Sequence, residues 1–238
     1  MAQISTDSGD SMTKLRAGGI AILAIMVGLS LAGCGSDEKK AAPTTSSSTK
    51  KTSAAPSQEV AKPSPTIPDY IKQNGITETP VKRGDPGSPE INLPFPPGWE
   101  DLGPQTPQWA WGGIKYTGDP AMADHPPTII ALLSKLTGNV DPAKILQFAP
   151  GEMKNLPGFE GSGDGQPSKL GGFDAWEVGG TYMKKGVRHA VAQKTVTIPA
   201  ADGLFVLQLN ADGTEDQMGV LADATKVIDD QTTITPAP

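Results

Sequence analysis

The residue whose type and position most clearly indicate a chemical role is Cys34, the only cysteine in a chain of 238 residues. It ends the sequence Leu-Ala-Gly-Cys over 31–34, which closes an apolar run that begins shortly after Lys14 and Arg16. A basic start, an apolar middle and small residues at the end are the layout of a signal segment. The run is short for a membrane helix, which needs roughly 20 apolar residues. The sequence therefore predicts an export signal over 1–33 with a thiol directly after it.

Small residues that lead into a cysteine resemble the lipobox of bacterial lipoproteins. The resemblance implies that diacylglycerol is attached to the Cys34 sulfur through a thioether and that the signal is cleaved after Gly33. Acyl chains contribute about 0.8 kcal/mol per buried methylene, so two or three of them hold a protein on a bilayer. We expect a chain anchored by lipid on the extracytoplasmic face of the cell membrane or exposed at the cell surface. Translation is expected to start at Met12, since Asp7 and Asp10 suit no signal segment.

Residues for metal or acid–base chemistry are few. The two histidines are His125, in a proline-rich loop, and His189, in a predicted strand. A zinc site needs several such ligands close together, and nothing in these two elements brings them together. The glycine run over 161–165 is preceded by no strand and followed by no Lys-Ser or Lys-Thr, so a surface loop is expected rather than a phosphate loop.

Residues 210–216 are similar to part of a calcium loop, but Gly219 stands where the bidentate glutamate would be required. We expect a turn there that caps the last helix. Without a nucleophile, a cofactor loop or a metal-ligand set, the sequence predicts a protein that is not an enzyme and that holds no cofactor and no metal.

Four tryptophans are the remaining candidates for a binding site: Trp99, Trp109, Trp111 and Trp176. Core packing is the usual role of such side chains. The alternative is that they line an apolar groove for acyl chains, where indole N–H groups meet sugar or headgroup hydroxyls. Alternation over 109–116 predicts a strand with Trp109 and Trp111 on one face.

Composition divides the chain after the signal into two parts. Residues 34–66 begin with Cys34 and continue as a Ser, Thr, Pro, Ala and Lys linker that has too little apolar surface to fold. Residues 67–238 have the length of one globular domain. From residue 67 the chain holds 13 of the 20 Lys and Arg but 21 of the 26 Asp and Glu, so the domain has a net charge of about −8. Nucleic acid is therefore excluded as a partner.

Periodicity predicts an antiparallel sheet with helices packed against it, in the α+β class with an α/β/α sandwich. Expected helices are 68–75, a helix that begins at Asp141, and a last helix around 220–229 with Thr214 and Gln217 as a capping box. Expected strands are 128–136, a hairpin of 173–183 with 187–198, and 204–209.

Several strings in this domain are similar to those of the LpqN/LpqT family of mycobacterial lipoproteins. They are YI at 70–71, NGIT at 74–77, LP at 93–94, PPGWE at 96–100, LTGNVDP at 136–142, AQKT at 192–195, IP at 198–199 and VLQLN at 206–210. The resemblance spans about residues 68–234 and implies a Mog1p/PsbP-like fold. It also implies an envelope role, since family members are associated with trehalose mycolate lipids, with the transporters that export them, and in some cases with host-cell effects.

The sequence thus predicts an envelope lipoprotein anchored through Cys34 that binds a trehalose mycolate-like glycolipid or a lipid-export machine and supports envelope assembly. The alternative is an adaptor for protein–protein interactions at the cell surface, acting on host proteins without a lipid ligand.

Metabolic labelling with a clickable fatty acid tests the anchor. The wild-type chain is expected to take up the label and to fractionate with membranes, because the Cys34 sulfur is the acceptor. Cys34→Ser is expected to lose both properties. A wild-type chain that stays unlabelled would contradict the prediction.

Overall fold

The computed structural model describes residues 62–237 of the chain. The expected signal segment, Gly33, Cys34 and most of the linker lie outside these residues. Within residues 62–237, no helix is both long and apolar enough to cross a membrane.

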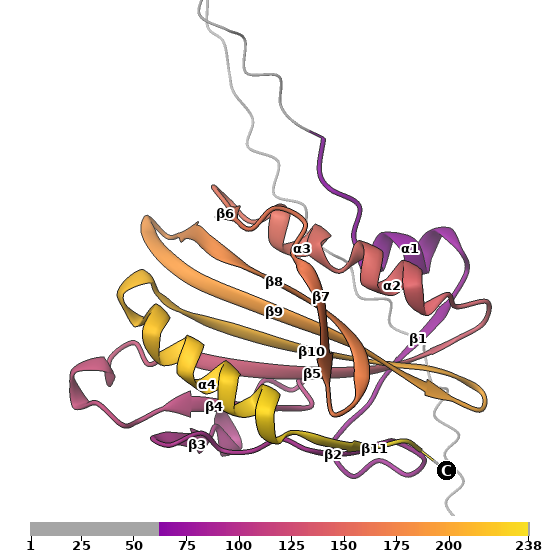
Figure 1. Ribbon diagram of the computed structural model, residues 1–238, viewed down its shortest axis with the longest axis horizontal. Coiled ribbons are helices and arrows are strands. Elements are labelled where there is room, and N and C mark those ends of the chain that lie inside the picture. The colour runs from indigo at the N-terminus through magenta and orange to yellow at the C-terminus, as the bar shows by residue number, and fades with distance from the viewer. Residues whose placement is uncertain (1–61, 238) are drawn as a thin grey trace, which may run out of the picture. The chain divides into compact units, whose positions relative to one another are not determined.

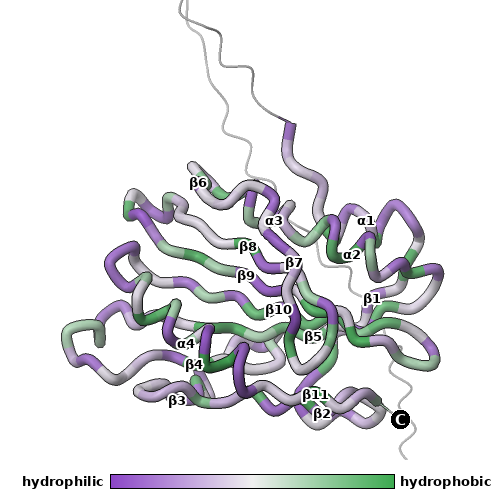
Figure 2. The backbone as a smooth tube through the Cα atoms, viewed as in Figure 1, coloured by the Kyte–Doolittle hydropathy of each residue, from purple (hydrophilic) through white to green (hydrophobic). Residues whose placement is uncertain are grey.

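Long stretches of alternating apolar residues form the centre of an antiparallel sheet (Figure 1). Three of its strands follow one another through tight turns: β8 (Phe173–Lys184), β9 (Val187–Ala200) and β10 (Gly203–Thr214). β5 (Thr128–Thr137) pairs with β10 on the other side. Figure 2 shows hydrophobic residues along the central strands, whereas the connecting loops are mostly hydrophilic.

Short strands extend this sheet at both edges. These short strands are β1 (Thr77–Pro80), β3 (Trp99–Asp101), β4 (Gly112–Tyr116), β6 (Glu160–Gly161) and β7 (Gln166–Leu170). The order in the sheet is β3-β4-β5-β10-β9-β8-β6, with β1 also paired to β5 and β7 also paired to β8. A separate two-stranded sheet joins β2 (Glu90–Asn92) to β11 (Thr233–Thr235).

Helices cover both faces of the main sheet, and apolar side chains of β10 alternate between these two faces. Val206 packs in a core with Ile145, on the face covered by α1 (Ile67–Gln73), α2 (Pro142–Phe148) and α3 (Pro150–Lys154). Leu207 packs in the other core with Leu221 of α4 (Met218–Gln231). The expected antiparallel sheet between helices is therefore confirmed. Short 3₁₀ turns are η1 (Gly103–Gln105), η2 (Pro120–Met122) and η3 (Glu215–Gln217).

Two local predictions were wrong. The strand predicted over 109–116 begins only at Gly112, because the Lys82 ammonium bonds the carbonyls of Gln108 and Ala110 and holds that segment as a turn. The turn expected over 210–216 is strand as far as Thr214.

The strand accommodates the polar residues of 210–214 because they have partners across the sheet. Asn210 accepts a hydrogen bond from Gln193, and Asp212 accepts one from Tyr182. The capping pair at the start of the last helix is confirmed, since the Gln217 side chain accepts from the Thr214 amide at 2.9 Å.

Substitution of Gln217 tests how strongly its hydrogen bonds stabilise the start of α4. Its side chain is buried, accepts from the Thr214 amide and donates to the His125 carbonyl at 2.8 Å. Gln217→Ala is expected to lower the free energy of unfolding by about 1–3 kcal/mol, because two polar groups lose their partner. Denaturant unfolding followed by circular dichroism measures this. Exposed Lys226→Ala on the same helix is the control, and an equal loss there would contradict the prediction.

Candidate functional site

A groove runs beside α4 over β8 and β9. It consists of two adjoining cavities of about 540 and 420 Å³, which share lining residues from β8, β9 and α4. The shared residues are Gly179, Ala192, Ala222 and Thr225. We call this depression the α4 groove.

Small side chains make the α4 groove deep. Register pairs Gly179 with Ala192 and Thr181 with Ala190 across β8 and β9. A Cβ atom on Gly179 would meet only the Val191 carbonyl at 3.5 Å and the Ala192 Cβ at 3.8 Å, which are ordinary contacts. These strands therefore leave space where larger residues would have filled the gap beside the helix.

One end of the α4 groove is polar and is organised by Lys194. The Lys194 ammonium contacts Asp229 of α4 at 2.6 Å, Glu177 of β8 at 3.0 Å and the Ser168 hydroxyl of β7 at 3.0 Å. Its side chain is only 10% exposed. A buried charge requires partners of this kind, because an unpaired ammonium in a dry environment is strongly unfavourable.

Glu177 is held ionised by the same cluster. Burial acts to raise its pKa, but hydrogen bonds from Gln166 and Lys194, the charge of Lys194 and a hydrogen bond from Ser168 together place the pKa below its ordinary value of 4.5. The carboxylate therefore remains an acceptor at neutral pH.

A second charged pair lies close to this cluster. Lys226 and Asp230 also line the groove and pair with each other at 2.7 Å. The polar end thus carries two ammonium groups and three carboxylates, which offer both donors and acceptors with a net negative charge.

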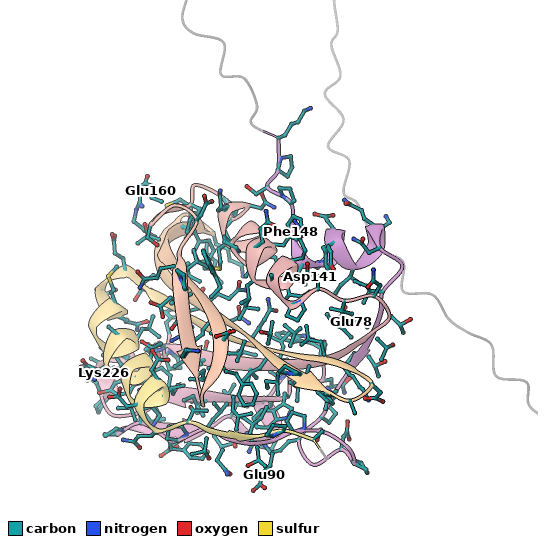
Figure 3. The ribbon with its side chains drawn as sticks, turned by 45° about the vertical axis from the view of Figure 1, so that its right-hand side comes forward. Glu78, Glu90, Asp141, Phe148, Glu160 and Lys226 are labelled. Carbon is teal, nitrogen blue, oxygen red and sulfur yellow. The ribbon has the colours of Figure 1, made fainter. Side chains whose placement is uncertain are left out.

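The other end of the α4 groove is apolar and open. It is lined by Leu221, Thr181, Glu160 and Met218, and Met218 is 46% exposed. Figure 3 shows the two ends separated along the molecule, with Lys226 near one and Glu160 near the other. From Glu177 to Thr181 the floor follows β8 for roughly 13 Å at strand spacing.

The four tryptophans lie in separate surroundings within residues 62–237. Trp99 and Trp111 are buried in the core on the α4 side, and the Arg83 guanidinium lies 4.5 Å from the centre of the Trp111 ring. Trp109 is 61% exposed. Trp176 lines a second cavity of about 710 Å³ between α2, α3 and β7, where its indole N–H donates to the Asp164 carbonyl at 2.6 Å. The four side chains therefore share no cavity in the described part of the chain, and none lines the α4 groove.

The other sequence candidates have structural roles here. His125 is an exposed loop residue, and the glycine run over 161–165 spans from β6 to the turn before β7. His189 lies 3.1 Å from Asp212, which also accepts from Tyr182. Burial, followed by the hydrogen bond and charge of Asp212, raises the pKa of Tyr182. Among residues 62–237, no three His, Cys, Asp or Glu side chains are placed to hold a metal ion.

The geometry defines a class of protein in which helices cover both faces of an antiparallel sheet and an open groove lies beside one helix. Comparison with known proteins identifies the family. The model described as "Probable lipoprotein LpqN" matches residues 63–235, so the chain belongs to the LpqN lipoprotein family.

Individual relatives agree with this assignment. The chain is 55% identical to Lipoprotein LpqN of Mycobacterium tuberculosis (strain ATCC 25618 / H37Rv) over 224 residues, which cover 91% of this chain and 97% of the relative. It is 59% identical to the crystal structure of LpqN described as involved in cell envelope biogenesis of that organism. That match covers 74% of this chain and 100% of the other, with a TM-score of 0.70. A variant of the protein Mog1 matches at 15% identity and a TM-score of 0.37, over 67% of this chain and 97% of that chain.

The Lys194 cluster makes the stability of the fold depend on pH. Because the pKa of Glu177 is below its ordinary value, its contribution is complete above about pH 4.5 and is lost as the pH falls through the folded-state value. Urea unfolding between about pH 6 and pH 3 is expected to show a smaller loss of stability for Glu177→Gln than for the wild type. Identical pH profiles for the two proteins would contradict this expectation.

Proposed function

We propose that this chain is a membrane-anchored, non-enzymatic envelope lipoprotein that binds a glycolipid in the α4 groove and supports envelope assembly. The observation that carries the proposal is a groove with an apolar part that ends on the buried Lys194 ammonium and its part-exposed partners Glu177 and Asp229. The envelope role follows the description of the LpqN structure, which this chain resembles at 59% identity.

The apolar part of the groove suits one acyl chain. Its floor is made of Gly179, Ala190 and Ala192, and Leu221 lines the helix side. These side chains offer apolar contact without polar groups that a methylene chain would leave unpaired. Apolar burial of this kind contributes roughly 25 cal/mol per Å².

The polar end favours a neutral, hydroxyl-rich headgroup over a phosphate. Two ammonium groups and three carboxylates leave a net negative charge, which repels an anion. Sugar hydroxyls both donate and accept, so they can bond to Asp229 and Asp230 as well as to Lys226. A trehalose mycolate-like glycolipid has this combination of sugar and long chain.

Filling the groove tests the proposal. Ala192→Leu places a larger side chain on the groove floor, and it is expected to raise the Kd for a short-chain alkyl trehalose at least about tenfold, ~1.4 kcal/mol. Isothermal titration calorimetry of the full chain below the micelle concentration of the probe measures the change. Ala143→Leu is the matched control, since Ala143 is exposed and lines the cavity beside Trp176 instead.

Three results would count against the proposal. One is an absence of heat for the wild-type chain at saturating probe. Another is a loss of binding in Ala143→Leu but not in Ala192→Leu, which would move the ligand to the other cavity. The third is a protein partner that is crosslinked at the cell surface and retained after delipidation while the probe does not bind, which would favour the adaptor.

A further inference from the structure

We propose that the β8–β9 turn is a bilayer-docking surface that sets the open end of the α4 groove on the membrane. The surface, which we call the hairpin end, comprises Met183 to Arg188. Its proposed occupant is the phospholipid surface to which the chain is tethered.

The hairpin end combines exposed apolar residues with a basic residue. Met183 is 37% exposed and Val187 is 49% exposed. Lys184 pairs with Asp212 and Arg188 pairs with Glu160, whereas Lys185 forms no ion pair within the described part of the chain. Apolar side chains beside a lysine suit the membrane interface, because the chains enter the acyl boundary while the ammonium stays among the headgroups.

The backbone makes the turn narrow and projecting. Lys185 has φ of 51° and Gly186 has φ of 82°, so both central residues of the two-residue turn are left-handed. This is the geometry that continues the twist of the flanking strands. The turn can therefore reach a surface without rearrangement of the sheet.

The chain enters the domain next to the hairpin end. The Asn155 side chain bonds both the amide and the carbonyl of Ser64, at 2.7 and 2.9 Å. Two residues later, the Pro157 carbonyl accepts from the Met183 amide at 2.8 Å. Figure 1 shows residues 62–66, β6 and the β8–β9 turn in the upper part of the same view.

The tether therefore brings the hairpin end close to the membrane more readily than the opposite end of the domain. Only 27 residues separate Cys34 from Lys62. Tethering to a surface raises the local concentration of that surface, so a weak contact is sufficient.

The open end of the α4 groove lies beside the hairpin end. Thr181 lines it, and Met183 and Arg188 are the next pair on the same face of the hairpin. Docking would turn this opening toward the bilayer and the polar end, at Lys194, away from it. A lipid whose headgroup leaves the bilayer before its acyl chain could then place this headgroup at the polar end. The lipid would not have to turn around, because its acyl chain would still be directed toward the bilayer. This last consequence rests on glycolipid binding in the α4 groove, whereas the docking rests only on the membrane anchor of the proposed function.

The test uses two matched exposed apolar positions in the full, lipid-anchored chain. Val187→Cys and Phe95→Cys each receive a polarity-sensitive dye, since the Cys34 sulfur is occupied by the anchor and Phe95 is 53% exposed between β2 and β3. The proteins are reconstituted in phosphatidylcholine and phosphatidylglycerol vesicles that contain doxyl-labelled lipid. Quenching at 187 is expected to exceed quenching at 95 by about threefold or more.

A second substitution tests the basic residue. Lys185→Glu in the Val187→Cys chain is expected to reduce the quenching at least by half, because a carboxylate is repelled by the anionic surface. Equal quenching at the two positions, stronger quenching at 95, or none at either would overturn the docking proposal. Because these vesicles contain no glycolipid, the result is independent of whether the α4 groove binds alkyl trehalose.

Discussion

One buried cation, Lys194, joins four elements of the fold. It extends from β9 to carboxylates on β8 and α4 and to a hydroxyl on β7. Removing a partner from such a cluster lowers stability, since the buried ammonium is then less well compensated. The same contacts fix the distance between α4 and the uncovered strands. The position of the groove therefore depends on the ion cluster at its polar end.

The size of the side chains on the α4 face explains why the helix lies where it does. On β10 and β5 this face carries Phe205, Leu207 and Leu133, all almost fully buried, and the apolar side of α4 packs on them. On β8 and β9 the same face carries Gly179 and Ala192. A helix gains more by packing on large side chains, and the strands with small ones are left as the floor of a groove.

Sequence patterns were sufficient for the central part of the fold. Alternation predicted the β8–β9 hairpin, and helical spacing with the Thr214 and Gln217 pair predicted α4. The start of β4 could not be predicted, because the Lys82 ammonium that holds Gln108 and Ala110 comes from more than twenty residues away. The end of β10 was missed for a similar reason, since Asn210 and Asp212 have the composition of a turn and only cross-strand partners make them acceptable in a strand.

The groove was harder to predict than the strands that form it. Glycine and alanine have no chemical signature, and their common placement beside α4 depends on strand register. The tryptophans lie elsewhere, because two of the four are core residues and Trp176 lines the other cavity, where its N–H already has a partner. The available signal was the alternation of small residues in the hairpin, at Gly179, Ala190 and Ala192.

A groove of this composition implies where selectivity resides. Contacts between methylenes and small apolar side chains are non-directional, and one methylene more or less changes affinity by only about 1–3 kcal/mol. Hydrogen bonds to buried polar groups discriminate far more strongly, because a ligand that fails to pair leaves those groups unsatisfied. The α4 groove places Lys194, Lys226 and three carboxylates at one end and a floor of small apolar residues toward the other, where Glu160 is the one charged residue among the described residues that line the second cavity of the groove. Under the proposed function, discrimination among lipids is therefore set by the headgroup at Lys194, Glu177 and Asp229, and chains of different length are accommodated at the open end.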